Sequence, residues 1–286
     1  MEDLGLVLVG LAAGLLGGCL GIGGSVIMIP AMHILLGPAQ HIYQGAAMIV
    51  NLFVVVPSVV QHRRAGLILG PVVRATIPAA LLGVVLGVWI SDSRWFHGAN
   101  EIRLARIFGV FLLYEAAYNV YRLGTGRVLP EMGEEAAAGL PWWRTTLLVG
   151  LPTGLIAGLL GVGGGVLAVP LQQLVLRVPL RRAIANSAAT IIVVSLVGAT
   201  YKNLANARAG LEVARSLQLA GVLIPTAMVG GYFGARLTHV LPRRALRAVL
   251  VVLLLYCGMS LLKRCEQRAA GELPGANPAP SASLPA

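Results

Sequence analysis

The stretch LGIGGSVIMIP, residues 20–30, interrupts a long hydrophobic run with three glycines in four residues and a proline six residues further on. A glycine in a helix interior costs about 1 kcal/mol relative to alanine, so a helix is expected to break here. The stretch LGVGGGVLAVP, residues 160–170, repeats the same pattern. The sequence therefore predicts two broken helices, each lying between two apolar arms.

Composition places the chain in a lipid bilayer. Of the 286 residues, 57% are hydrophobic and 12% are charged, and the mean hydropathy is +0.82, whereas a soluble domain carries about 25% charged residues. A membrane-spanning helix needs about 20 apolar residues. The long apolar stretches are 4–37, 43–60, 67–90, 102–121, 142–177, 183–201, 216–235 and 245–262. The fold class predicted from these about eight segments is an all-α polytopic membrane protein.

The basic character of the chain fits a membrane surface rather than a nucleic acid. The net charge of +11 lies in loops and at helix ends, as in QHRRAG at 61–66 and LPRRALR at 241–247. Anionic lipid headgroups are natural partners for arginines at such positions. No nucleic-acid partner is expected. Cys19, Cys257 and Cys265 have no paired spacing, so neither a disulfide, nor a metal site, nor a cofactor is predicted.

Residues 1–122 and 142–264 are similar to each other and are predicted to be two transmembrane repeats, each with one glycine-broken helix and three further helices. A shift of 140 residues places Gly10, Gly14, Gly18, Gly21, Gly23, Gly24 and Pro30 on Gly150, Gly154, Gly158, Gly161, Gly163, Gly164 and Pro170. QGAAMI at 44–49 faces NSAATI at 186–191, and RAGL occurs at both 64–67 and 208–211. We expect an acidic, turn-rich linker at 123–141 and a disordered Pro/Ala/Ser-rich tail at 265–286.

The lengths of the arms bear on the topology of the repeats. An arm such as 26–37 or 166–177 reaches only about 18 Å at 1.5 Å per residue, which is half a membrane. A re-entrant hairpin would give inverted repeats, whereas a bent full span would give parallel repeats. Lysines and arginines are spread evenly over the connections, so loop charge does not choose between them. Interrupted hydrophobic segments at matching positions are typical of secondary transporters, and we favour inverted repeats.

A glycine break can create an anion site. It exposes backbone N–H groups at the positive end of the helix that follows, and the missing side chains let an anion approach closely. Broken helices at membrane depth are tolerated where they line a cavity or are buried in protein. We therefore expect the two breaks to face each other and to build a substrate site. The wider-spaced glycines at 10, 14, 18, 150, 154 and 158 are instead expected to pack helices closely.

The paired GxGGxxxxxP segments, Gly21 to Pro30 and Gly161 to Pro170, resemble those of the sulfite exporter TauE/SafE family, also called the toluene sulfonate uptake permease family. QHRRAGLI at 61–68 is similar to a basic-glycine turn of that family. The resemblance covers nearly the whole chain apart from the linker and the tail. It implies a protein that moves small anions, often sulfite or organosulfonates, across the bacterial inner membrane.

The two halves differ in polarity after their breaks. Where the family tends to have a GTSL-like stretch, the first half has Gly45-Ala46-Ala47-Met48, without a hydroxyl, while the second half keeps amide and hydroxyl groups. The predicted substrate-binding residues are Gly21, Gly23, Gly24, Ser25, Gln44, Asn51, Gly161, Gly163, Gly164, Gly165, Gln172, Asn186, Ser187 and Thr190. The amides among them could instead serve to tie helices together.

Charged and titratable residues inside the apolar segments are few. Glu115 lies well within a hydrophobic segment, where a carboxylate is by default a functional candidate, and we consider it for proton coupling beside a structural role. Lys202 is expected to reach the membrane interface with its ammonium. His33, His41 and His62, near helix ends and without metal-ligand spacing, are expected to be solvated structural residues.

The sequence as a whole predicts a secondary transporter of a small anion, with export the favoured direction and protons a possible coupling ion. The acidic start Met1-Glu-Asp is unlike the basic start of a cleaved signal peptide, so the first hydrophobic segment is expected to remain as an anchor. A membrane-embedded enzyme would need an HExxH, Gly-x-Ser-x-Gly or paired-acid motif, none of which occurs. A scaffold would not need two matched breaks. A transporter of another solute or a cation is the closer alternative, although a cation path would be lined with acids.

Overall fold

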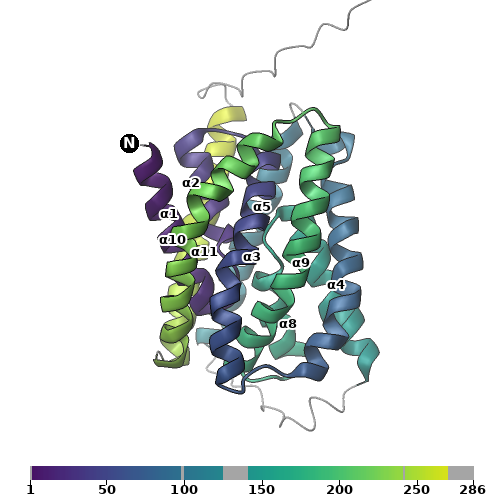
Figure 1. Cartoon of the computed structure of the whole chain (residues 1–286), viewed down its shortest axis with the longest axis vertical. Coiled ribbons are helices and arrows are strands. Elements are labelled where there is room, and N and C mark those ends of the chain that lie inside the picture. The colour runs from purple at the N-terminus through teal and green to yellow at the C-terminus, as the bar shows by residue number, and fades with distance from the viewer. Residues whose placement is uncertain (1, 98–99, 125–140, 241, 270–286) are drawn as a thin grey trace, which may run out of the picture.

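The computed structural model describes residues 2–97, 100–124, 141–240 and 242–269, and within this part every regular element is a helix (Figure 1). Ten α-helices are described: α1 (Glu2–Leu20), α2 (Ser25–Leu36), α3 (Gln40–Arg64), α4 (Gly70–Ser91), α5 (Glu101–Gly124), α7 (Leu151–Leu160), α8 (Gly165–Val175), α9 (Leu180–Arg208), α10 (Val213–Val240) and α11 (Arg243–Ala269). A 3₁₀ turn, η1 (Arg94–Phe96), precedes α5, and a π-helical turn, η3 (Arg144–Gly150), leads directly into α7.

Two segments expected from the sequence lie largely outside the described residues. These are the linker at 123–141, of which α5 takes the first two residues, and the tail at 265–286. Helix α11 continues to Ala269, five residues into the segment expected to be tail. Below, residues 2–124 are called the first half and residues 141–269 the second half.

Five helical stretches in the described part are long and apolar enough to cross a membrane: Gln40–Arg64, Gly70–Ser91, Leu180–Arg208, Val213–Thr238 and Ala248–Gln267. Four shorter apolar helices accompany them, at Leu4–Leu20, Ser25–Leu36, Arg144–Leu160 and Gly165–Val175. The protein is therefore a polytopic α-helical membrane protein, as the composition predicted.

Both predicted helix breaks are present. In the first break, Gly21 and Gly23 have φ angles of +65° and +78°. In the second, Gly161, Gly163 and Gly164 have φ angles of +76°, +68° and +83°. Glycine adopts this left-handed region without the steric penalty that other residues incur. Each break therefore depends on its glycines, and a new short helix starts directly after it.

Helices α3 and α9 lie side by side and run in opposite directions (Figure 1). At one end, Nζ of Lys202 on α9 lies 2.7 Å from Nδ1 of His41 at the start of α3. At the other end, the N–H of Leu69, just before α4, donates to Oδ1 of Asn186, near the start of α9, over 2.7 Å. In the view of Figure 1, α3 turns into α4 at the bottom and α9 turns into α10 at the top.

The helix that precedes each break packs on a helix of the other half through glycine. Helix α1 packs against α10, and α7 packs against α4. A methyl group added to Gly14 would collide with the carbonyl oxygen of Ala227, and one added to Gly154 with that of Ala80. These backbones therefore approach closely, which is the packing role predicted for the widely spaced glycines. The contacts fix each broken helix against the opposite half.

Candidate substrate site

The two breaks touch each other inside the protein. A methyl group added to Gly165, the first residue of α8, would lie 2.5 Å from the carbonyl oxygen of Gly21 and 2.5 Å from Cα of Ile22. The hydroxyl of Ser187 on α9 donates to the same Gly21 carbonyl over 2.9 Å. The glycines predicted to form a site are thus brought together, and Ser187 lies with them.

Asn51 on α3 occupies the start of α2. Its Oδ1 accepts hydrogen bonds from the N–H groups of Gly24, at 2.8 Å, and Ser25, at 3.2 Å. Its Nδ2 donates to the Ser25 hydroxyl over 3.0 Å. The first turn of a helix carries N–H groups without intrahelical partners, and a side-chain oxygen commonly satisfies them. In this conformation, Asn51 therefore takes the donors that the sequence had suggested for an anion.

The second break has no equivalent cap. Within the described residues, no side chain accepts a hydrogen bond from the N–H of Gly164 or Gly165 at the start of α8. A methyl group added to Gly163 would lie 2.8 Å from Asn51 Nδ2 and 3.2 Å from Ser195 Oγ. The Ser195 hydroxyl is fully buried and has no hydrogen-bond partner among the residues that the structure describes. The backbone of the second break is thus next to an amide donor and a free hydroxyl.

Gln44 on α3 also lies against the second break. Its backbone and aliphatic carbons would be 2.7–2.9 Å from a methyl group on Gly161. Its Nε2 donates to the carbonyl oxygen of Leu159, at the end of α7, over 3.0 Å, and its Oε1 has no partner in the described part of the chain. Gln44 therefore satisfies one of the carbonyls that the break leaves without an intrahelical partner.

Three predicted site residues form hydrogen bonds with groups other than the glycines of the breaks. Asn186 accepts from the N–H of Leu69 and donates through Nδ2 to Gln172 Oε1 over 3.0 Å. The Thr190 hydroxyl donates to the backbone carbonyl of Asn186, one turn earlier in its own helix, over 2.9 Å. Nε2 of Gln172 is buried without a partner. These groups join α8 and α9 to the loop before α4.

A small cavity lies beside the breaks. Its volume is about 20 Å³, and Ile22 of the first break and Val166 of α8 both line it. Its walls are apolar apart from Asn119 on α5 and Gln173 on α8. A cavity of this size holds about one water molecule. This cavity is therefore too small for a sulfite or a sulfonate in this conformation.

Glu115 is buried in α5, a helix that packs against α11. Its side chain is 2% exposed, and its Oε2 has no hydrogen-bond partner among the described residues. The amide of Asn119 donates to the Glu115 backbone carbonyl, not to the carboxyl group. Glu115 thus has no ion-pair partner among the described residues, although the structure does not place it at the breaks.

Sequence reasoning missed Ser195, although a signal was present. The RAGL repeat corresponds to a shift of 144 residues, and the same shift places Ser195 on Asn51. Both side chains flank Gly163. A search for polar residues at that shift would have found this pair, whereas the shift of 142 residues taken from QGAAMI and NSAATI led to Asn186 and Thr190 instead.

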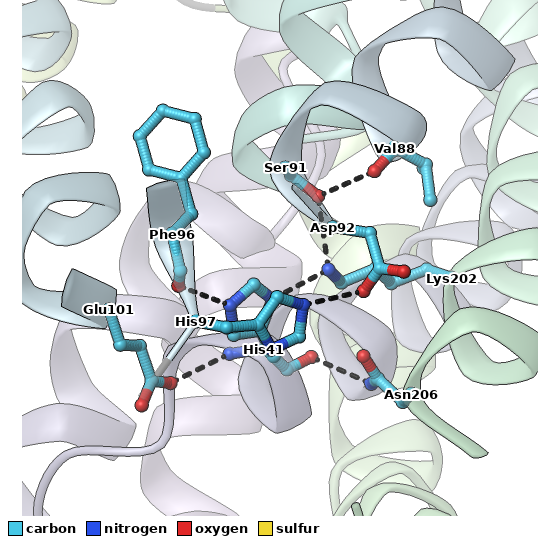
Figure 2. A network of polar contacts seen from close by, with 9 residues as sticks. All are labelled: His41, Val88, Ser91, Asp92, Phe96, His97, Glu101, Lys202 and Asn206. Atoms are coloured by element: carbon cyan, nitrogen blue, oxygen red, sulfur yellow. Dashed lines mark hydrogen bonds and ion pairs between the residues drawn. The ribbon is translucent and has the colours of Figure 1, made fainter. Parts of the chain in front are cut away.

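Two expectations about charged and titratable residues are wrong. Lys202 does not reach the membrane interface, because its side chain is 0% exposed and held by His41 and Ser91 (Figure 2). His33, His41 and His62 are buried rather than solvated. The reason is that their helix ends pack against other helices, so a position near a helix end does not place a side chain in water.

This architecture defines a class of protein. Two interrupted helices that meet in the interior of a polytopic helical protein, with glycine backbone at the contact, are typical of membrane transporters. Comparison with known families agrees with that class: the chain belongs to the sulfite exporter TauE/SafE family, whose model matches residues 6–261.

Relatives of the chain are named as membrane transporters. The probable membrane transporter protein MamO of Paramagnetospirillum magneticum is 30% identical over 279 residues, which cover 87% of this chain and 42% of that protein. The probable membrane transporter protein YunE of Bacillus subtilis is 22% identical over 286 residues, 90% of this chain and 96% of YunE. The probable inner membrane transporter protein TsaS of Comamonas testosteroni is 27% identical over 191 residues, 65% of this chain and 70% of TsaS.

The chain spans less than half the length of MamO, at 42%, but nearly all of YunE, at 96%. No solved structure matches the chain. The family and the relatives are named as transporters rather than enzymes, and the chain is a multi-pass membrane protein of a transporter family.

Proposed function

We propose that this protein is a secondary transporter, with export the favoured direction, that carries a small anion such as sulfite or an organosulfonate across the bacterial inner membrane. The anion binds between the two glycine-broken helices, and alternating access exposes it to each side in turn. The relative TsaS is named a probable inner membrane transporter protein, which supports the inner membrane as the location.

The surroundings of the second break carry the proposal. The N-terminal end of a helix bears a positive partial charge and N–H groups without intrahelical partners, which together favour an anion. Among the described residues, no side chain accepts from these N–H groups at α8, and Asn51 Nδ2 and the Ser195 hydroxyl lie against Gly163. The break thus offers an anion backbone N–H groups, an amide donor and a hydroxyl, and no carboxylate is among the nearest atoms to its glycines.

Alternating access is supported by the small volume of the cavity beside the breaks. The cavity beside Ile22 and Val166 has a volume of about 20 Å³, enough for about one water molecule. A sulfite or a sulfonate does not fit in this volume, and in the proposed mechanism it enters when one half moves relative to the other. The contact of Gly165 with Gly21, which joins the two halves, is the contact that such a movement would separate.

Inverted repeats form part of the proposal. Helices α3 and α9, which correspond under the sequence shift, run antiparallel, and each joins its next helix at the opposite end of the protein (Figure 1). Likewise, α1 packs on α10 as α7 packs on α4. This pairing is what a pseudo-two-fold axis in the membrane plane would produce.

Glu115 is the candidate for a coupling proton. A carboxyl group that is buried without an ion-pair partner can exchange a proton without disrupting a salt bridge. Proton coupling predicts that a pH gradient alone drives accumulation of the anion on one side of the membrane.

The test is a flux panel in proteoliposomes. Sulfite, sulfate, thiosulfate, sulfoacetate and chloride are each measured for saturable exchange, with and without a pH gradient. Saturable exchange of one or more of these anions is expected. Absence of exchange for every anion, with protein shown to be folded and inserted, would count against the proposal.

Asn51→Asp gives a sharper version of the same test. The introduced carboxylate can still accept from the N–H groups of Gly24 and Ser25, but it adds a negative charge next to Gly163. We expect folding to persist and anion exchange to fall by at least about tenfold, the effect of about 1.4 kcal/mol. The control is Asn100→Asp, before α5 and outside the breaks. Equal exchange by both variants would place the anion elsewhere.

A further inference from the structure

A buried polar cluster joins the two halves at the end where α3 begins and α9 ends (Figure 2). Its members are His41, Ser91, Asp92, His97, Glu101, Lys202 and Asn206. The cluster is separate from the breaks, because Lys202 follows Ser195 by seven residues on α9, about 10 Å along the helix axis. It therefore needs its own explanation.

Lys202 is a buried cation held by neutral groups. Its Nζ lies 2.7 Å from His41 Nδ1 and donates to Ser91 Oγ over 3.0 Å. Among the described residues, no carboxylate oxygen lies within 4.0 Å of it, since the one ion pair in that part of the chain joins His97 to Asp92. Burial of a charge is costly unless it is paired, so this arrangement is sensitive to any further charge.

Hydrogen-bond geometry fixes the role of each nitrogen of His41. Its Nε2 lies 2.9 Å from the carbonyl oxygen of Phe96, which can only accept, so Nε2 carries a hydrogen. The Nδ1 atom is then the acceptor for Lys202. A backbone carbonyl that accepts from one ring nitrogen in this way sets the tautomer of the ring.

In this geometry, the His41 and Lys202 side chains together can hold only one proton beyond those of a neutral imidazole and a neutral amine, called the excess proton below. That proton can lie on Lys202 or on His41, and the contact between Nζ and Nδ1 persists in either case because one nitrogen still accepts. A second proton would leave two cationic donors 2.7 Å apart with no acceptor between them. The contact must then separate.

Charges on every surrounding element are accounted for. Asp92, after α4, pairs with His97 over 2.9 Å, and the His97 ring stacks on that of His41 at 4.5 Å. Glu101 on α5 accepts from the His41 backbone N–H over 3.1 Å. Arg215 on α10 interacts electrostatically with Tyr43, which lies two residues after His41 on α3. The two carboxylates attract Lys202 from a distance, while a protonated His97 would repel a protonated His41.

We infer that His41 and Lys202 form a proton-binding latch between α3 and α9, closed while the pair holds one excess proton and opened by a second. The latch is a control on movement of the halves and is distinct from the coupling proton considered for Glu115. Its part in transport rests on the proposed function, whereas its response to pH does not.

Opening the latch would release further contacts between the halves. Asn206 Nδ2 donates to the His41 backbone carbonyl over 3.0 Å. One turn along α3, a methyl group added to Gly45 would lie 2.8 Å from Asn203 Oδ1 and 2.9 Å from Ser216 Oγ. Those two oxygens are buried without partners. Separation of α3 from α9 would therefore expose polar groups that lead from the cluster toward Gln44 and the breaks.

The first test measures exchange of the transported anion with the same pH on both sides of the liposome membrane. In the wild type we expect exchange to accelerate as the pH falls from 7 to 5, by up to about tenfold per unit for a one-proton event once the pH is below the ordinary imidazole pKa of about 6.5. His41→Asn keeps an acceptor near the Nδ1 position but cannot bind the proton, so its rate should change with pH by less than about twofold. Lys202→Met should give fast exchange at every pH.

His97→Asn is the matched control, because it removes the stacked imidazole and leaves His41 in place. It should keep the acceleration at low pH. Acceleration that survives in His41→Asn, or that disappears only in His97→Asn, would overturn the inference. If His41→Asn does not fold, Lys202→Met provides the same comparison.

A second readout does not depend on transport. Hydrogen exchange of peptides covering 39–47 and 200–208 is measured at pH 5 and pH 7, corrected for the intrinsic exchange rate. Protection should be lower at pH 5 in the wild type and equal at both values in His41→Asn. If no anion is transported but protection depends on pH in this way, the latch is supported and the proposed function fails. Equal protection of the wild type at both pH values would overturn the latch.

Discussion

Gly165 packs against Gly21, so that a methyl group on the first residue of α8 would lie 2.5 Å from the carbonyl oxygen of the first break. The two interruptions, which the sequence places 140 residues apart, thus form one structure with no side chain between their backbones at this point. Helix N-termini and glycine backbone are concentrated where the halves meet, which is where the proposed alternating access would separate them.

Gly165→Ala should destabilise the protein by about 1–3 kcal/mol, because the added methyl group has no space and the neighbouring atoms belong to the backbone. The measurement is the melting temperature of the purified protein in detergent. Gly221→Ala on α10 is the control, since nothing lies within 4 Å of a methyl group there. Equal melting temperatures for the two variants would mean that the breaks do not touch in solution.

Ser195→Ala and Ser187→Ala should have opposite effects on stability. The Ser195 hydroxyl is buried without a partner, so its removal should be neutral or slightly stabilising, whereas Ser187→Ala leaves the Gly21 carbonyl without its donor and should cost about 1 kcal/mol. If Ser195 contacts the anion, Ser195→Ala should nevertheless reduce exchange. A drop in melting temperature together with unchanged exchange for Ser195→Ala would contradict this assignment.

The breaks and the helical membrane fold could be predicted because glycine and hydropathy act locally. Gly21 and Gly161 have the left-handed φ angles for which glycine is suited, and the apolar runs have the length of a bilayer. Partners across the two halves could not be predicted. Asn51 caps the start of α2 from 26 residues away, and Lys202 meets His41 across 161 residues of chain. The composition of a helix end does not show which helix will cover it.

Glu115→Gln tests the coupling proton. The substitution keeps the size of the side chain and removes its ability to bind a proton in the pH range of the assay. We expect accumulation driven by a pH gradient to disappear, while exchange at equal pH on both sides persists. Since a gradient of one pH unit can support about tenfold accumulation for one proton per anion, the difference is large enough to measure. Retained accumulation would leave Glu115 with a structural role.

Gly14→Ala and Gly154→Ala test whether the two halves are built alike. Each added methyl group would collide with a carbonyl oxygen of the opposite half, that of Ala227 or that of Ala80. Both variants should therefore lose stability by a similar amount, about 1–3 kcal/mol, because the same close approach of backbones is disturbed. The measurement is the melting temperature of each variant, which reports the loss of stability directly. A large loss in one variant and none in the other would show that the equivalence of α1 and α7 does not extend to their packing.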